Sequence, residues 1–198
     1  MCILQRVADQ ESIQTIADSR VLAAMSHPVR RRLLDVLTVD GPSTVTMLAQ
    51  RTGEAIGNVS HHLKVLNHAA LVEEAAELAR DRREKWWRVA SLTRRWSSTS
   101  FQSDPASVAV AEAAASLNLE HQVSKARAWL AQAETADPTW VDAAFSTDTW
   151  LQLSCDELKE LSEQIIALLA GWRGRESLDD GAERATVFLF ARGMPAAP

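Results

Sequence analysis

Residues 51–72, RTGEAIGNVSHHLKVLNHAALV, constrain the fold of this chain more than any other stretch. Gly53 predicts the end of one helix, because glycine readily adopts the left-handed conformation found at helix C-termini. A second helix is predicted from about Ala55 to Asn67. With about 100° between successive residues, one face of this helix is suited to packing: Val59, His62, Leu63 and Leu66. The opposite face and its flanks are small or polar and carry one cation: Gly57, Asn58, Ser60, His61 and Lys64.

Such a polar face provides the chemistry that a helix needs in the major groove of DNA. Taken alone, the helix would fit an ordinary amphipathic surface helix equally well, but its flanks favour the second helix of a helix-turn-helix. We expect His61 to be a DNA contact and His62 to be packed and hydrogen-bonded. Because adjacent helical residues point about 100° apart, the two histidines cannot chelate a metal together.

The residues before this stretch predict three further helices. Residues 11–25 have apolar residues at helical spacing, and His27-Pro28 then starts a new helix, since proline suits the first helical position. The third helix is predicted over Met47–Thr52, capped by Thr46, after a short strand at Thr44-Val45.

Three consecutive arginines, Arg30, Arg31 and Arg32, stand at the start of the helix that follows Pro28. Cations are unfavourable at a helix N-terminus. Two explanations fit the sequence equally well. The arginines contact DNA phosphates, or they form a solvated face with Asp35 as a local partner.

A β-hairpin is predicted after the polar helix from the segments 71–75, 77–83 and 84–90, as two antiparallel strands around a turn at residues 79–82. The period of a strand does not place Trp86 and Val89 on one face, so a twist or bulge is expected in the second strand. Four cations lie within six positions of its tip: Arg80, Arg82, Arg83 and Lys85. A basic hairpin at this place can reach the DNA backbone or minor groove, as a wing does, although a single arginine there could be a solvated loop charge.

The formal charge is unevenly distributed along the chain. Residues 1–100 hold 14 Lys and Arg against 11 Asp and Glu, a net charge of +3. Residues 101–198 hold 7 against 15, a net charge of −8, which together gives the −5 of the whole chain. Because phosphate attracts the first half and repels the second, we expect DNA binding by the first half and another role for the second.

Residues 20 to about 92 resemble the winged helix-turn-helix of ArsR-type bacterial transcriptional regulators. The segments that carry the resemblance are Leu22–Leu37, with its "SHPVRRRLL", the "VSHHLKVL" of Val59–Leu66, Ala70–Val72 and the basic hairpin. The resemblance implies a homodimeric repressor that reads a palindromic operator in double-stranded DNA and often releases it on binding an effector.

Two departures from that family qualify the resemblance. The family usually has Ser or Pro near Ala55, so the polar helix here lacks an obvious side-chain cap. Metal-sensing members carry Cys-Val-Cys where this chain has Thr44-Val45-Thr46. Without those thiolates a soft metal has no ligands, and His121 has no second histidine three or four residues away. We therefore expect no metal site and no cofactor.

A linker rich in Ser and Thr (91–104) precedes a long helix, predicted over 105–135 with Asp104 as its cap. Apolar residues along it alternate spacings of four and three, as in a coiled-coil seam: Leu119, Val123, Ala126, Leu130 and Ala133. The seam fits a dimerisation helix, and packing against the same chain explains it equally well.

Residues 138–198 are predicted to form a small α/β unit. A strand is expected at Thr149–Leu153, a capping box at Ser154–Glu157 opens an amphipathic helix, and Ala185–Ala191 reads as a buried strand. Aromatic residues in this half could line a pocket for a small organic effector: Trp129, Trp140, Trp150 and Trp172. That they fill a small core is the favoured interpretation, and a module that only dimerises or binds a protein partner is the alternative function.

The predicted fold is therefore α+β and mostly helical. It comprises a winged helix-turn-helix over 11–92, a long helix over 105–135 and an α/β effector or dimerisation domain over 138–198. The chain has two cysteines that are far apart in the sequence, and the apolar run in its first ten residues is too short for a signal peptide. It also has no apolar run of about 18 residues, the length that a membrane span needs. These observations predict a cytoplasmic protein that is not embedded in a membrane. No catalytic motif is found, so a regulator rather than an enzyme is expected.

Overall fold

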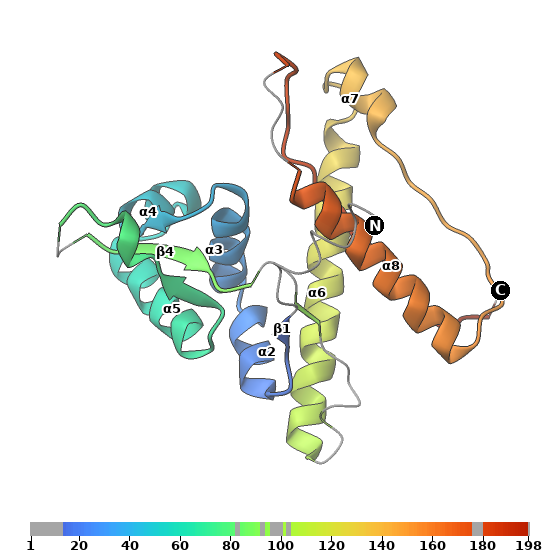
Figure 1. Cartoon of the computed structure of the whole chain (residues 1–198), viewed down its shortest axis with the longest axis horizontal. Helices are drawn as coiled ribbons and strands as arrows, with labels where there is room; N and C mark the ends of the chain where they lie inside the picture. The colour runs from blue at the N-terminus through green and yellow to red at the C-terminus, as the bar shows by residue number, and fades with distance from the viewer. Residues whose placement is uncertain are drawn as a thin grey trace, which may run out of the picture. The chain divides into compact units, whose positions relative to one another are not determined.

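The computed structural model describes residues 14–81, 84–91, 94–95, 101, 104–175 and 180–197. The chain forms two compact units, which we call the N-terminal unit (Glu11–Leu119) and the C-terminal unit (Glu120–Pro198 with Met1–Gln10). The long helix α6 (Pro105–Gln132) begins in the first unit and ends in the second (Figure 1).

The N-terminal unit packs short helices against a small antiparallel sheet (Figure 1). Before α6 its described elements are β1 (Gln14–Thr15), α2 (Ser19–Ser26), α3 (Pro28–Val39), β2 (Ser43–Thr44), α4 (Val45–Thr52), α5 (Ile56–His68), β3 (Val72–Glu74), the 3-10 turn η1 (Ala76–Leu78), β4 (Trp86–Val89) and β5 (Arg94–Arg95). The sheet has the order β2-β4-β3, and β1 pairs in parallel with β5. The expected mostly helical fold with a winged helix-turn-helix is confirmed for this unit.

The core of this unit lies where α3, α4, α5 and β3 meet. Its best-buried side chains lose all or nearly all contact with solvent: Leu33, Leu37, Leu48, Val59, Leu63, Leu66, Leu71 and Val72. Each such side chain contributes about 1.5–3 kcal/mol relative to an exposed one. This core sets how each helix is rotated about its own axis.

Local sequence signals set the helix ends. Gly53 ends α4 with a φ of 73°, the left-handed conformation predicted for it. Asp18 caps α2 and His27 caps α3, so the first helix of the described residues begins at Ser19. The helical pattern expected over 11–25 is therefore wrong for residues 14–18, while residues 11–13 lie outside the described part. Ile16 precedes α2 and is buried, while Ile13 lies outside the described residues.

The turn before α4 also differs from its prediction. Thr44, rather than Thr46, caps α4, because its hydroxyl accepts a hydrogen bond from the Met47 amide at 3.3 Å. The short strand is correspondingly Ser43–Thr44, paired with β4.

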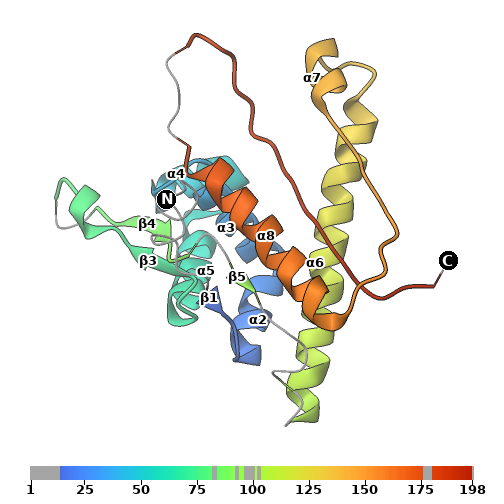
Figure 2. The ribbon, with the colours of Figure 1, turned by 45° about the vertical axis from the view of Figure 1, so that its right-hand side comes forward.

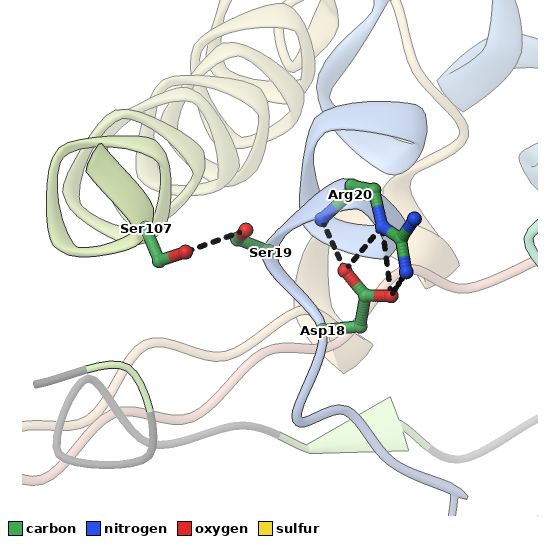
Figure 3. Close-up of polar contacts among 4 residues, drawn as sticks. All are labelled: Asp18, Ser19, Arg20 and Ser107. Carbon is green, nitrogen blue, oxygen red and sulfur yellow. Dashed lines mark hydrogen bonds and ion pairs between the residues drawn. The ribbon is translucent and has the colours of Figure 1, made fainter. Parts of the chain in front are cut away.

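The start of α6 is joined to the N-terminal unit through α2. Asp104 caps α6 by accepting from the amides of Ala106 and Ser107, as expected. The hydroxyls of Ser19 and Ser107 lie 3.0 Å apart, next to the ion pair of Asp18 with Arg20 (Figure 3). Ala111 and Ala114 are buried in the same core, so the first part of α6 packs against its own chain.

The wing is built from β3 and β4, which pair with Val72 opposite Val89 and Glu74 opposite Trp87. Trp87 is buried and Val89 packs against the core, and the two share a face because they are two residues apart. The twist or bulge expected from Trp86 is therefore unnecessary, since the tryptophan that faces the core is the next one. The predicted first strand is also shorter, because η1 follows it.

The C-terminal unit contains the end of α6, α7 (Pro138–Ala143) and α8 (Cys155–Arg173). The capping box at the start of α8 is confirmed: the Ser154 hydroxyl accepts from the Glu157 amide, and the Glu157 carboxylate accepts from the Ser154 amide. The second part of the α6 seam is exposed, with Leu130 70% accessible.

The two strands predicted in this unit are wrong. No strand is assigned in 138–175 or 180–197, and the segments at 144–154 and 181–197 run as extended traces (Figure 2). The physical reason is the absence of a partner. An extended segment becomes a strand only when a neighbouring backbone completes its hydrogen bonds, and within the described part of the chain none does so.

The three arginines of α3 hold other helices. Arg30 donates from Nε to the Ala24 carbonyl at 2.5 Å, and Arg32 donates from Nη1 to the Thr52 carbonyl at 3.0 Å. Those carbonyls lie in the last turns of α2 and α4, where a cation is favourable. Arg31 donates to the Asn118 side chain at 3.0 Å and lies 3.5 Å from Asp35. The Asp35 partner expected from the sequence is present for Arg31, and contacts with other elements, which the sequence did not predict, involve all three cations. A contact with DNA phosphates stays a prediction.

We predict that Arg30→Gln lowers the free energy of unfolding by about 1.5–3 kcal/mol, the range for hydrogen bonds to a charged group. Urea unfolding monitored by circular dichroism would measure this. Arg20→Gln is the matched control: Arg20 is highly exposed and pairs only with Asp18 in the described structure, so its loss should be close to zero. Equal stability of both variants with the wild type would show that the Arg30 contacts do not stabilise α2.

Candidate nucleic-acid interface

The helix α5 presents a polar face outward because its other face is buried. Val59, Leu63 and Leu66 are fully buried and His62 is 7% exposed, which confirms the predicted packing face. The opposite face and its flanks are accessible, with Ser60 half-buried and the others exposed: Gly57, Asn58, His61 and Lys64. This is the helix that follows the turn at Gly53, at the position of a recognition helix.

The first turn of α5 is open on its outer side. Ala55 is the N-cap and provides no side-chain hydrogen bond, as the sequence indicated. A Cβ atom added to Gly57 would meet no atom within 4 Å, so the packing of this chain does not require glycine there. Asn58 donates to the Glu54 carboxylate at 2.7 Å in an exposed hydrogen bond. Backbone amides and small side chains at such a turn allow close approach of a phosphate or a base edge.

The wing is less basic than its sequence suggested. Lys85 pairs with Glu74 at 2.9 Å, and Arg88 pairs with Glu73 and Glu77. The amide of Arg80 donates to the Glu84 carboxylate at 2.9 Å. Arg82 and Arg83 lie outside the described residues.

The wing carries acidic side chains as well as the cations at its tip. Residues 73–88 contain five acidic and five basic side chains, so the hairpin is neutral as a whole. This signal was visible in the sequence. A neutral hairpin attracts DNA only if its cations and acids occupy different places.

The predicted effector residues do not come together in the described structure. Trp129 on α6 and Trp140 on α7 are half-buried, whereas Trp150 and Trp172 are 66% and 63% exposed. The Arg175 guanidinium lies over the Trp172 ring, 4.3 Å from its centroid. Among the described residues, no ring contact joins two of these four tryptophans.

Within the described ranges, no group of three or more His, Cys, Asp or Glu side chains is arranged to hold a metal ion. Thr44 and Thr46 stand where metal-sensing ArsR-type proteins have cysteines, and Thr44 is used as the cap of α4. None of the described helices is long and apolar enough to cross a membrane.

A pair of histidines links the start of α3 to the buried side of α5. The rings of His27 and His62 lie 4.6 Å apart between centroids, and His61 contacts the His62 ring at 5.3 Å. His27 Nδ1 accepts from the Val29 amide, while His62 Nδ1 is buried without a hydrogen bond, contrary to the expectation for His62. Burial lowers the pKa of His27 and of His62 below the ordinary value, and the Arg30 cation adds to this effect.

We predict that acid destabilises this helix pair at a mild pH. When the folded pKa of a histidine is lowered, the unfolded chain binds the proton more readily, so protonation favours unfolding. The stabilising contribution is complete above the unfolded value of about 6.5 and is lost as the pH falls through the folded values.

Urea unfolding at a series of pH values would measure this effect. His62→Gln should flatten the dependence below about pH 6.5, whereas His68→Gln, at the exposed end of the same helix, should leave it unchanged. A wild-type stability that is constant from neutral pH to about pH 5.5 would contradict the prediction.

Comparison with known proteins covers the same region. A family model described as "Helix-turn-helix domain" matches residues 25–75. None of the curated proteins matches the chain. The chain is similar to the crystal structure of a fragment of a "possible transcriptional regulatory protein" from Mycobacterium bovis, with 23% identity, a TM-score of 0.33, and coverage of 54% of this chain and 88% of that one.

Two further solved structures are similar at the same level. The solution structure of a homodimeric winged helix-turn-helix domain from Mycobacterium bovis, described as "a possible ArsR-family transcriptional regulator", has 22% identity and a TM-score of 0.34, covering 56% of this chain and 80% of that one. The transcriptional repressor BigR from Xylella fastidiosa has 25% identity and a TM-score of 0.33, covering 52% and 82%. The helix-turn-helix family model thus matches residues 25–75, and α5 (Ile56–His68) lies within that match.

Proposed function

We propose that this chain is a DNA-binding transcriptional regulator that acts as a dimer and reads a palindromic operator. The observation that carries the proposal is α5, whose apolar face is fully buried while its polar face is accessible. Repression, release by an effector and a place in the cytoplasm are the parts of the proposal that rest on the resemblance to ArsR-type regulators.

Base reading is assigned to the outward face of α5. His61 and Asn58 can donate to or accept from base edges, and Lys64 adds a cation one turn further along. Gly57, Ser60 and the uncapped amides at the start of α5 would contact the sugar-phosphate backbone. The hydrogen bond from Asn58 to Glu54 is exposed, so a base can replace it at little cost.

The wing is assigned to the DNA backbone or minor groove. Arg80, Arg82 and Arg83 would provide the positive charge at its tip, since Lys85 already pairs with Glu74. Lys85 could still contact phosphate by exchanging partners, because both members of that pair are exposed.

Two copies are needed because one α5 reads only one half-site. In regulators with this motif the two half-sites lie about 34–36 Å apart, or a multiple of that distance, so a dimer must hold two recognition helices at a set spacing. The exposed seam of α6, with Leu119 and Leu130, and the segment around Ile13, Ile16 and Val21 are the predicted contacts. Ile16 is used in the core of its own chain, which favours α6.

The proposal also includes the binding of a small organic effector by the C-terminal half of the chain. Its four candidate tryptophans all lie in or near elements with exposed apolar surface, so a ligand that covers Trp150 or Trp172 would remove apolar area from water. The alternative is that the same residues belong to a protein interface.

We predict that His61→Ala weakens binding to the operator by about 1–3 kcal/mol, the range for a lost base contact. The operator would first be located by gel shift on the DNA next to the gene. Fluorescence anisotropy would then compare operator with random DNA. Binding to random DNA should change less, since phosphate contacts remain.

The matched control for His61 is His68→Ala, an exposed histidine in the last turn of the same helix. It should leave operator binding nearly unchanged. Equal losses on operator and random DNA for His61→Ala would mean that His61 contacts phosphate only. Absence of binding by the wild type to any upstream fragment would contradict the proposed function.

For the wing, we predict that replacing Arg82 and Arg83 together by alanine weakens binding to all DNA sequences. The slope of log affinity against log salt should fall by about one to two units, because each phosphate contact releases about one counterion. A double alanine variant at Lys125 and Arg127, two exposed cations of α6, controls for the change in net charge. An unchanged slope in the Arg82 and Arg83 variant would place the two arginines away from the backbone.

A further inference from the structure

The C-terminal unit has no buried side chain among its described residues, 120–175 and 180–197. The N-terminal unit, in contrast, contains the whole buried core of the described chain. A segment of this size needs an apolar core to offset its loss of conformational entropy. In proteins most of the stability of an amphipathic helix such as α8 comes from packing of its apolar face rather than from intrinsic helix propensity. The described residues of the C-terminal unit therefore lack the burial that would stabilise them within one chain.

Its apolar side chains face solvent instead. Of 19 large hydrophobic residues that are exposed in the described structure, 13 lie in the C-terminal unit. Most of them are on two extended segments, the first arm (144–154) and the second arm (181–197) (Figure 2). Phe145, Trp150 and Leu151 on the first arm are 75%, 66% and 58% exposed. Monomeric proteins rarely leave an apolar surface of this extent uncovered.

The second arm has an inner and an outer face. Phe188 contacts the His121 ring of α6 at 5.8 Å between centroids, and Arg192 donates from Nε to the Gln122 side chain at 2.8 Å. Phe190 lies beside Phe188, on the same side of an extended chain. Val187 alternates with them and is 68% exposed. The outer face of the arm is therefore apolar and uncovered.

Both arms have the composition of strands and lack a partner. Residues 149–153 and 186–191 are rich in β-branched, aromatic and aliphatic side chains and include no charged residue. No strand of the described chain pairs with either. If these segments are to be buried, their backbone amides and carbonyls must find hydrogen bonds. A strand from another chain provides those bonds and covers the apolar side chains together.

We propose that a second copy of this chain covers both arms, which pair across the dimer as strands and build one shared core from two C-terminal units. The inference builds on the dimer of the proposed function and assigns its main contact to the arms. Association then folds the C-terminal unit, whereas the N-terminal unit has its own core.

A second copy is favoured over an unrelated protein for two reasons. The arms are uncharged at their centres, so two identical surfaces meet without repulsion, and a twofold axis uses the same apolar surface of both chains. The exposed surface also includes α6, α8 and both arms. That extent is typical of obligate homodimers, whose interfaces resemble a core divided between two chains.

Hydrogen-deuterium exchange of the full chain tests this directly. At micromolar concentration, where sedimentation should show a dimer, amides at 149–153 and 186–191 should exchange slowly. On dilution until the dimer dissociates, their exchange should accelerate at least about 10-fold, an order-of-magnitude step. Amides of α5 should be protected to the same degree at both concentrations, because their core lies within one chain.

A variant gives an independent test. Val187→Asp places a carboxylate on the outer face of the second arm, where it would be buried without a partner in the dimer. The dimer dissociation constant should rise at least about 100-fold, which corresponds to a burial cost of a few kcal/mol. Val39→Asp adds the same charge at an exposed apolar residue of α3 and should leave the constant unchanged. Continued protection of α5 amides would show that the Val187 variant remains folded in its N-terminal unit.

Three results would overturn the inference. The first is a monomer at micromolar concentration, and the second is a dimer whose arms exchange rapidly. The third is a monomer whose arms stay protected. Each would show that a second copy of the chain does not cover the arms. Operator binding is measured separately. If the arms are protected but the protein does not bind DNA, only the proposed function is contradicted. If the protein binds DNA specifically but the arms are not protected, only this inference is contradicted.

Discussion

The burial of one face of α5 is the constraint on which the candidate interface depends. Val59, Leu63 and Leu66 are fully buried between α3, α4 and the sheet. Because side-chain directions on a helix are set by its period, burying these three residues also sets where the remaining side chains point. His61 and Lys64 are exposed for this reason, and a helix rotated by one residue would place one or the other of them in the core.

Charge in this protein serves structure as much as it could serve DNA. The arginines of α3 bind carbonyls in the last turns of α2 and α4 and a side chain of α6. In the wing, Lys85 and Arg88 pair with acidic residues across the hairpin. The net positive charge of the first half is therefore larger than the charge that is available to bind phosphate. The assignment to DNA rests more firmly on the outward face of α5 than on the number of cations.

The two units differ in what stabilises them. The N-terminal unit combines local helix signals with a core, so its helix ends and its packing agree. The C-terminal unit has equally clear local signals, such as the capping box at Ser154, but no buried side chain among its described residues. If a second copy supplies the missing burial, the same association that places two recognition helices also stabilises the half of the chain that does not bind DNA.

The sequence by itself determined the features that depend on neighbouring residues. The α5 helix and its packing face, the left-handed Gly53, the caps at Asp104 and Ser154 and the wing after α5 all follow from local spacing, capping and turn chemistry. Only the tertiary structure decided the features that depend on distant partners. The role of Arg30, the pairing of His27 with His62 and the tryptophan that faces the core each require a contact between separate elements. The strand predictions at 149–153 and 185–191 failed for the same physical reason. A strand forms only with a neighbouring strand, whereas an apolar pattern indicates that a segment is buried but does not identify the chain that buries it.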